Sequence, residues 1–293
     1  MLKPLSGPLS DMKRLIQIRW WWRLLAALAV ILLAGFAFNP LYHRHVNRSL
    51  MLATERGDST SVLRRLAEGA DVNLLVSDKL TKPTASIYLK TLLHGEDAYP
   101  RTPRTTLLMV AVVSGHDRIV RQLLDDGAMV DARDEYGFTA LSMAISLKRP
   151  DMVQLLLDHH ADPSAPNDLD MPPLNWALLL KQNECARMLL QAGADPNSED
   201  KDGLPAVYLA VLDQNEDALR LLLEKGADAN AGYKGWSVLR LAIEQDDATA
   251  VHLLLHFGAH PNSVITGNVT LLALAKSQHR EDIAVLLRHA GAE

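Results

Sequence analysis

The residues best suited to metal chemistry are three histidines near the C-terminal end, His252, His256 and His260. A spacing of four residues places His252 and His256 on one face of a helix, where two imidazoles can hold a metal ion together. A zinc-type site needs further ligands, and no carboxylate or cysteine completes this set in the sequence. We therefore expect surface histidines and no metal.

Motifs of enzyme chemistry are absent from the chain. It contains no glycine-rich phosphate loop, no zinc-protease histidine pair and no nucleophile elbow. Cys185 is the only cysteine, so no disulfide can form within the chain, and we expect it to pack as a small apolar residue. We expect no catalytic residues and no cofactor. The alternative of another class is an enzyme with its site in residues 74–105 or on the histidines.

A variant of the phrase Gly-Ala-Asp-x-Asn occurs seven times. It starts at Gly69, Gly127, His160, Gly193, Gly226, Gly258 and Gly291, at spacings of 58, 33, 33, 33, 32 and 33 residues. A constant period in the thirties predicts a solenoid of stacked helical units and favours binding over catalysis. The first spacing exceeds one period by 25 residues, which indicates an insertion.

Each period reads as two short amphipathic helices joined by a tight turn. Neither helix can bury its apolar face alone, so stacking is required. An alanine column recurs at Ala53, Ala111, Ala144, Ala177, Ala210, Ala242 and Ala275, and an aliphatic column at Leu50, Leu108, Leu141, Leu174, Val207, Leu239 and Leu272. The recurring glycine is a helix C-terminal signal, because only glycine adopts the left-handed conformation without Cβ strain. His160 takes its place once.

The sequence resembles the ankyrin repeat. The clearest matches are GHDRIVRQLLDDGA at 115–128, YGFTALSMA at 136–144 and LLLEKGADAN at 221–230. The fourth unit departs from the T-P-L-H pattern with Pro172-Pro173-Leu174-Asn175. The resemblance covers about residues 47–293 and implies an all-α, ankyrin-type helix-turn-helix solenoid of about seven repeats that binds another protein.

The expected domain organisation has four parts. They are a cytoplasmic segment at 1–19, a single transmembrane helix at 20–38, a linker at 39–47 and an ankyrin-repeat domain at 48–293. Repeats are expected to end near residues 73, 131, 164, 197, 230, 262 and 293, with an insertion at 74–105.

The expected membrane anchor is the apolar stretch from Trp20 to Phe38. As a helix it spans roughly 28 Å, close to a bilayer core. A cleaved signal peptide is the alternative, although Gly35-Phe36-Ala37 is a poor cleavage site. Four basic residues precede the stretch and a fifth, Arg23, lies near its start, which favours a cytoplasmic N-terminus. We expect a single-pass protein of a bacterial inner membrane, with its repeats in the periplasm.

The net charge of residues 41–293 limits the kinds of partner that they can bind. Residues 1–40 hold five basic residues and one acidic residue, so 25 basic and 34 acidic residues remain in 41–293, a net charge of −9. An acidic domain argues against nucleic acid and is compatible with a basic protein partner. Acidic residues gather at the expected turn tips, namely Asp134, Glu135, Asp168, Asp170, Glu199, Asp200 and Asp202.

The expected partner-binding site is the concave groove. The residue before each first helix is apolar five times running: Phe138, Met171, Leu204, Trp236 and Val269. Tyr136, Leu147, Leu179 and Leu180 extend this surface. An exposed apolar stripe indicates a protein-binding surface, whereas the competing interpretation packs several of these side chains against the adjacent turn.

The expected function is a membrane-anchored module that captures or positions a partner protein. Within that class, a scaffold and a cognate inhibitor, such as an immunity protein against an antibacterial effector, stay open. The 74–105 insertion is a second candidate contact, as a finger, because long insertions in compact domains are often functional. A purely structural link between the membrane and another cell structure is the third class.

Overall fold

The computed structural model describes residues 40–77, 104–134, 137–167, 170–265 and 269–293. These ranges hold fourteen helices and three two-stranded sheets, so the expected all-helical ankyrin-type solenoid is confirmed as the dominant architecture. None of these fourteen helices combines the length and the hydrophobicity that a bilayer crossing needs. The transmembrane helix expected at 20–38 lies outside the described residues. The chain divides into two compact units at Asp71–Val72.

The first unit contains one helix pair, α2 (Pro40–Arg56) packed against α3 (Ser59–Ala67). Asp58 caps α3 by accepting the Ser61 N–H at 3.0 Å, and hydrogen bonds from the Ser61 side chain and then from its backbone lower the pKa of the Asp58 carboxyl. Helix α2 includes residues 40–47, which we expected to be a linker. Proline does not prevent this, since the first helical position needs no N–H donor.

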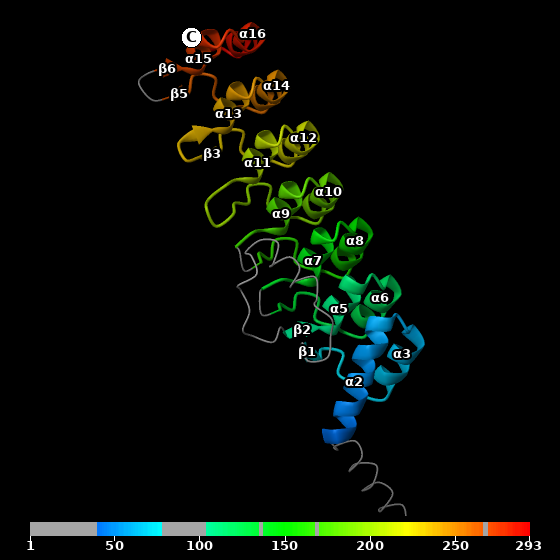
Figure 1. Ribbon diagram of the computed structural model, residues 1–293. Helices are drawn as coiled ribbons and strands as arrows, with labels where there is room; N and C mark the ends of the chain where they lie inside the picture. Colours follow the sequence, from blue (N-terminus) through cyan, green and yellow to red (C-terminus); the bar gives the residue numbers. More distant parts are fainter. Residues whose placement is uncertain (1–39, 78–103, 135–136, 168–169, 266–268) are drawn as a thin grey trace, which may run out of the picture. The chain divides into compact units, whose positions relative to one another are not determined.

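The second unit contains six helix pairs that stack one after another (Figure 1). The first helix of each pair is called the inner helix and the second the outer helix. The inner helices are α5 (Leu107–Ser114), α7 (Ala140–Ser146), α9 (Pro173–Leu179), α11 (Ala206–Leu212), α13 (Val238–Glu244) and α15 (Leu271–Ser277). The outer helices are α6 (Asp117–Asp125), α8 (Pro150–Asp158), α10 (Asn183–Gln191), α12 (Glu216–Glu224), α14 (Ala248–His256) and α16 (Glu281–His289).

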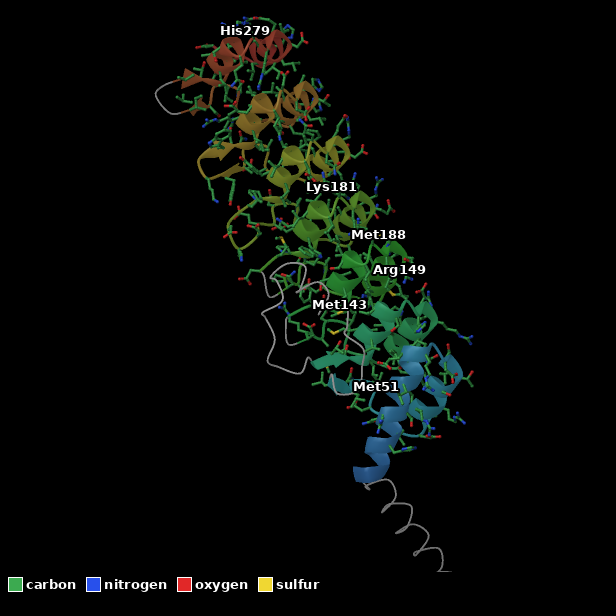
Figure 2. The ribbon with its side chains drawn as sticks, viewed as in Figure 1. Met51, Met143, Arg149, Lys181, Met188 and His279 are labelled. Carbon is green, nitrogen blue, oxygen red and sulfur yellow. The ribbon has the colours of Figure 1, made fainter. Side chains whose placement is uncertain are left out.

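The residues of both predicted columns are buried. Every member of the alanine column is at most 6% exposed, and so is every member of the aliphatic column. Small side chains in one column let neighbouring inner helices approach, while the aliphatic column fills the space between them. Met143, labelled in Figure 2, adds to this core from α7 at 1% exposure.

Two backbone positions in each pair of the second unit adopt a left-handed conformation. The repeated glycines after the outer helices have φ between 86° and 96° from Gly127 to Gly291, and His160 adopts 64° in their place, as predicted. The turn between inner and outer helix holds the second position. Glycine occupies it at Gly115, but the later pairs use Lys148, Lys181, Gln214, Asp246 and His279 with φ of 51–59°. Lys181 and His279 are labelled in Figure 2. Left-handed non-glycine residues cost about 1 kcal/mol or more each.

Pairs of short antiparallel strands lie on the side of the inner helices (Figure 1). They are β1 (Leu75–Ser77) with β2 (Arg104–Thr106), β3 (Gly232–Tyr233) with β4 (Trp236–Ser237), and β5 (Val264–Ile265) with β6 (Val269–Thr270), all antiparallel. Lys234 and Gly235 both have positive φ, as a two-residue turn matching the strand twist requires. Strands β1 and β2 pair the two ends of the expected insertion, whose residues 78–103 lie outside the described residues.

Side chains at the end of the repeated phrase join each repeat to the next. Asn197 accepts the Asp228 N–H at 2.7 Å and donates its amide to the Gly226 carbonyl at 3.2 Å. This pair of hydrogen bonds is called a rung. Asn73, Asn230 and Asn262 form equivalent rungs to the next loop. Asp131 makes only the accepting bond, from the Asp162 N–H at 2.9 Å, because a carboxylate has no N–H to donate.

Candidate protein-binding surface

Four leucines at the C-terminal ends of inner helices form the inner leucine patch: Leu147, Leu179, Leu180 and Leu212. Leu179 and Leu212 are separated by one period, and so are Leu147 and Leu180, so each pair occupies equivalent positions in neighbouring repeats. Helix α9 packs between α7 and α11, which brings these positions side by side. Leu179 is 47% exposed and Leu212 is 49% exposed, whereas Leu147 and Leu180 are half-buried. The arrangement offers two apolar knobs one repeat apart.

The residues before the inner helices do not form one uniformly exposed stripe. Phe138 is 3% exposed, and its N–H donates to the Asp134 carboxylate at 2.9 Å. Met171, Leu204 and Trp236 are half-buried, while Val269 is 39% exposed. Tyr136 lies outside the described residues. The expectation of a free surface therefore does not hold for Phe138, whose side chain belongs to the core, and for the other residues it stays a prediction.

The expected acidic tips also divide into two kinds. Asp134 is 6% exposed, and Asp134 and Asp200 each close a turn by accepting the N–H four residues later, from Phe138 and Leu204. Asp134 is thus a structural turn residue and not a solvated tip. The hydrogen bond to Tyr233 is the main cause of the raised pKa of Lys234, and the charges of Asp202 and Asp200 add smaller effects.

An aromatic and cationic cluster lies beside the hairpin β3–β4. The Arg240 guanidinium stacks over the Trp236 ring, with 3.8 Å between the guanidinium carbon and the ring centroid. Tyr208 of α11 meets Tyr233 edge-on at 5.6 Å, and burial raises the pKa of the Tyr208 phenol. Stacking on Arg240 holds Trp236 in place and orders its half-exposed face. Lys234 covers the Tyr233 ring at 4.8 Å.

Several residues of this surface are not identified by the sequence reasoning. Leu212 stands one period after Leu179, so the repeat itself contains the signal that could have found it. Tyr208 and Arg240 occupy the variable position after the aliphatic column, where Met109, Ser142, Asn175 and Ala273 stand in other repeats. Nothing in the periodic pattern sets that position apart.

His252, His256 and Cys185 carry the side chains considered above for metal binding or nucleophilic chemistry. The His252 and His256 rings stack at 6.4 Å between centroids, and across the described ranges no three His, Cys, Asp or Glu side chains gather as a metal site. Cys185 is 1% exposed, as expected of a core residue. Burial, with a smaller effect of the Glu184 charge, raises the pKa of its thiol to about 11, so the thiol stays protonated at neutral pH.

A comparison with known protein families identifies the type of repeat. The family model described as "Ankyrin repeats (3 copies)" matches residues 50–167 and 174–265, which is well over half of the chain. A curated relative, a putative ankyrin repeat protein of Rickettsia bellii (strain RML369-C), is 32% identical over 104 residues. The match covers 34% of this chain and 41% of that relative, so less than half of the relative's length is represented.

Solved structures match a larger share of this chain than the curated relative does. The ankyrin repeat domain of Bcl-3, described as a unique member of the IkappaB protein family, matches with a TM-score of 0.63 and 26% identity, covering 82% of this chain and 97% of that one. An ankyrin repeat domain from Acinetobacter baumannii AYE matches with a TM-score of 0.59 and 29% identity, covering 64% and 98%.

Proposed function

The chain belongs to the ankyrin-repeat family, and on that premise we propose that it captures or positions a partner protein through the inner leucine patch. Ankyrin-repeat domains are protein-binding modules, and the family is a non-enzymatic interaction fold. The observation that carries the proposal is the pair Leu179 and Leu212, both about half exposed at equivalent positions of adjacent repeats. Large apolar side chains arranged in this way are typical of interfaces.

Apolar contacts would supply most of the binding free energy, and charged groups would orient the partner. Burying the exposed half of each leucine against a partner contributes on the order of 1 kcal/mol or more. Half-exposed Trp236, held by Arg240 near the N-terminal end of α13, supplies a separate aromatic contact of low conformational entropy. The net charge of −9 over residues 41–293 supports a basic partner, since opposite charge speeds association.

Leu179→Asp combined with Leu212→Asp is expected to weaken partner binding by about tenfold or more, because two charged groups would be desolvated at the contact. The measurement starts with a photo-crosslinking residue at position 179 or 212 in cells, followed by mass spectrometry of the adduct. The affinity of the purified partner for both proteins is then compared by calorimetry.

Val285→Asp is the matched control, because Val285 is 42% exposed on the outer helix α16. It should bind with unchanged affinity, and a crosslinker at Arg187 of α10 should give no adduct. Equal capture from positions 179 and 187, or full affinity of the double variant, rules out the inner leucine patch. The identity of the partner separates the scaffold from the inhibitor role.

We propose that residues 20–38 anchor the module in a bacterial inner membrane, with residues 1–19 cytoplasmic and the repeats periplasmic. The apolar stretch and the excess of basic residues before it support this orientation. The lipid bilayer is then a second partner, held by the anchor and not by the acidic repeats.

Deleting residues 1–39 is expected to move the protein from the membrane fraction to the soluble fraction. In spheroplasts, added protease should degrade the repeats of the full chain while a cytoplasmic marker stays intact. Protection of the repeats in intact spheroplasts, with cleavage after lysis, would reverse the orientation. Fractionation of the full chain as a soluble protein, or a shortened mature N-terminus, would exclude the anchor.

A further inference from the structure

At one position in the described residues of the second unit, neither hydrogen bond of the rung forms. The residue at the rung position between the pairs α7–α8 and α9–α10 is Ser164, whose side chain is too short to reach the next loop. By equivalence its partners would be the Gly193 carbonyl and the Asp195 N–H. Within the ranges that the structure describes, the Asp195 N–H has no hydrogen-bond partner, whereas Asp228 and His260 have theirs. This boundary is called the Ser164 interface.

A cavity opens at the same place. It has a volume of about 230 Å³ and is lined on one side by Pro163 and Ser164 and on the other by Ala194, Asp195 and Ser198, with Leu174 among its walls. The two loops are therefore neither hydrogen-bonded nor closely packed where the rung is missing. Atoms that face each other across a gap gain little dispersion energy, so this edge of the interface is weakly held.

The opposite edge of the Ser164 interface is firmly joined. The Trp176 indole N–H donates to the Ser146 hydroxyl at 2.9 Å, and the Gln182 amide donates to the Ile145 carbonyl at 2.6 Å. Trp176 is only 3% exposed, so its ring also fills the space between α7 and α9. One edge of the interface is thus bonded and packed, while the described residues lining the cavity at the loop edge, Ser164 and Asp195, are not joined to each other.

We propose that the Ser164 interface is a hinge of the stack, which opens at its loop edge and pivots on the Trp176 edge. Solenoids couple only nearest neighbours, so a weak interface opens without disturbing the others. Leu147 stands on one side of the hinge and Leu179 and Leu180 on the other, so its motion changes the spacing within the inner leucine patch. The hinge stands on its own contacts and does not depend on the proposed function.

Hydrogen–deuterium exchange of the full chain tests the hinge. Peptides covering 190–199 should exchange about tenfold faster than those covering 223–232, their equivalents one period later, because only the latter are held by a rung. Ser164→Asn supplies the missing amide and should slow exchange at 190–199 by about tenfold. Ser164→Ala removes the hydroxyl without adding a rung and should leave exchange unchanged.

Asn197→Ser creates the same gap at the next interface and should raise exchange at 223–232 to the native level of 190–199. Circular dichroism shows that each variant is folded. Equal exchange of the two peptides in the native chain overturns the hinge, whether or not the variants fold. So does a folded Ser164→Asn variant whose exchange at 190–199 stays fast. Partner binding is not measured, so failure of the hinge and failure of the proposed function are distinguishable.

Discussion

Replacing Trp176 by alanine is expected to lower the free energy of unfolding by about 3–5 kcal/mol, as for other buried aromatic side chains. The indole is 3% exposed and donates to Ser146, so the variant loses both apolar burial and a hydrogen bond between repeats. Urea unfolding followed by far-ultraviolet circular dichroism measures the change.

Two further variants separate these contributions. Trp176→Phe keeps most of the volume and loses only the hydrogen bond, so it should cost about 1 kcal/mol plus a small packing loss. Trp236→Ala removes a half-exposed indole and should cost clearly less than Trp176→Ala. Similar losses for both alanine variants would show that Trp176 does not fill the space between the inner helices.

Leu141→Ala is expected to cost about 2–5 kcal/mol, because it opens a cavity in the aliphatic column. Leu141 is 1% exposed, and α7 is confined between α5 and α9, which limits collapse around the cavity. Leu179→Ala is the matched control, since the same truncation at a 47% exposed position should change stability by at most about 0.5 kcal/mol. Equal urea midpoints for the two variants would contradict the assignment of the core column.

The period and its two columns are enough to predict the solenoid. A residue such as Ala144 recurs at the same place in every unit because every unit presents the same neighbour to it. The left-handed residue after each outer helix is predicted for the same reason, including His160. Residue types that recur at the same position of seven repeats predict a structure that the sequence of one helix alone would not.

The features that differ between repeats could not be predicted in this way. Phe138, Met171 and Val269 share one position in the period, yet their exposure rises from 3% at Phe138 to 39% at Val269, because it depends on how each loop packs. Lys148 and Lys181 adopt left-handed conformations, but neither position holds a glycine that would reveal this in the sequence. The Arg240–Trp236 stacking depends on the hairpin β3–β4, in which Trp236 is a strand residue.

The rung at Asn73 differs from the others in one respect. Its side chain reaches Met129, 56 positions further along the chain, whereas the rungs of Asn197, Asn230 and Asn262 reach only 30 or 31 positions ahead. Extra sequence between β1 and β2 therefore leaves the bond that fastens one repeat to its successor in place. Insertions between β1 and β2, natural or engineered, should therefore preserve this bond between repeats at a small entropic cost.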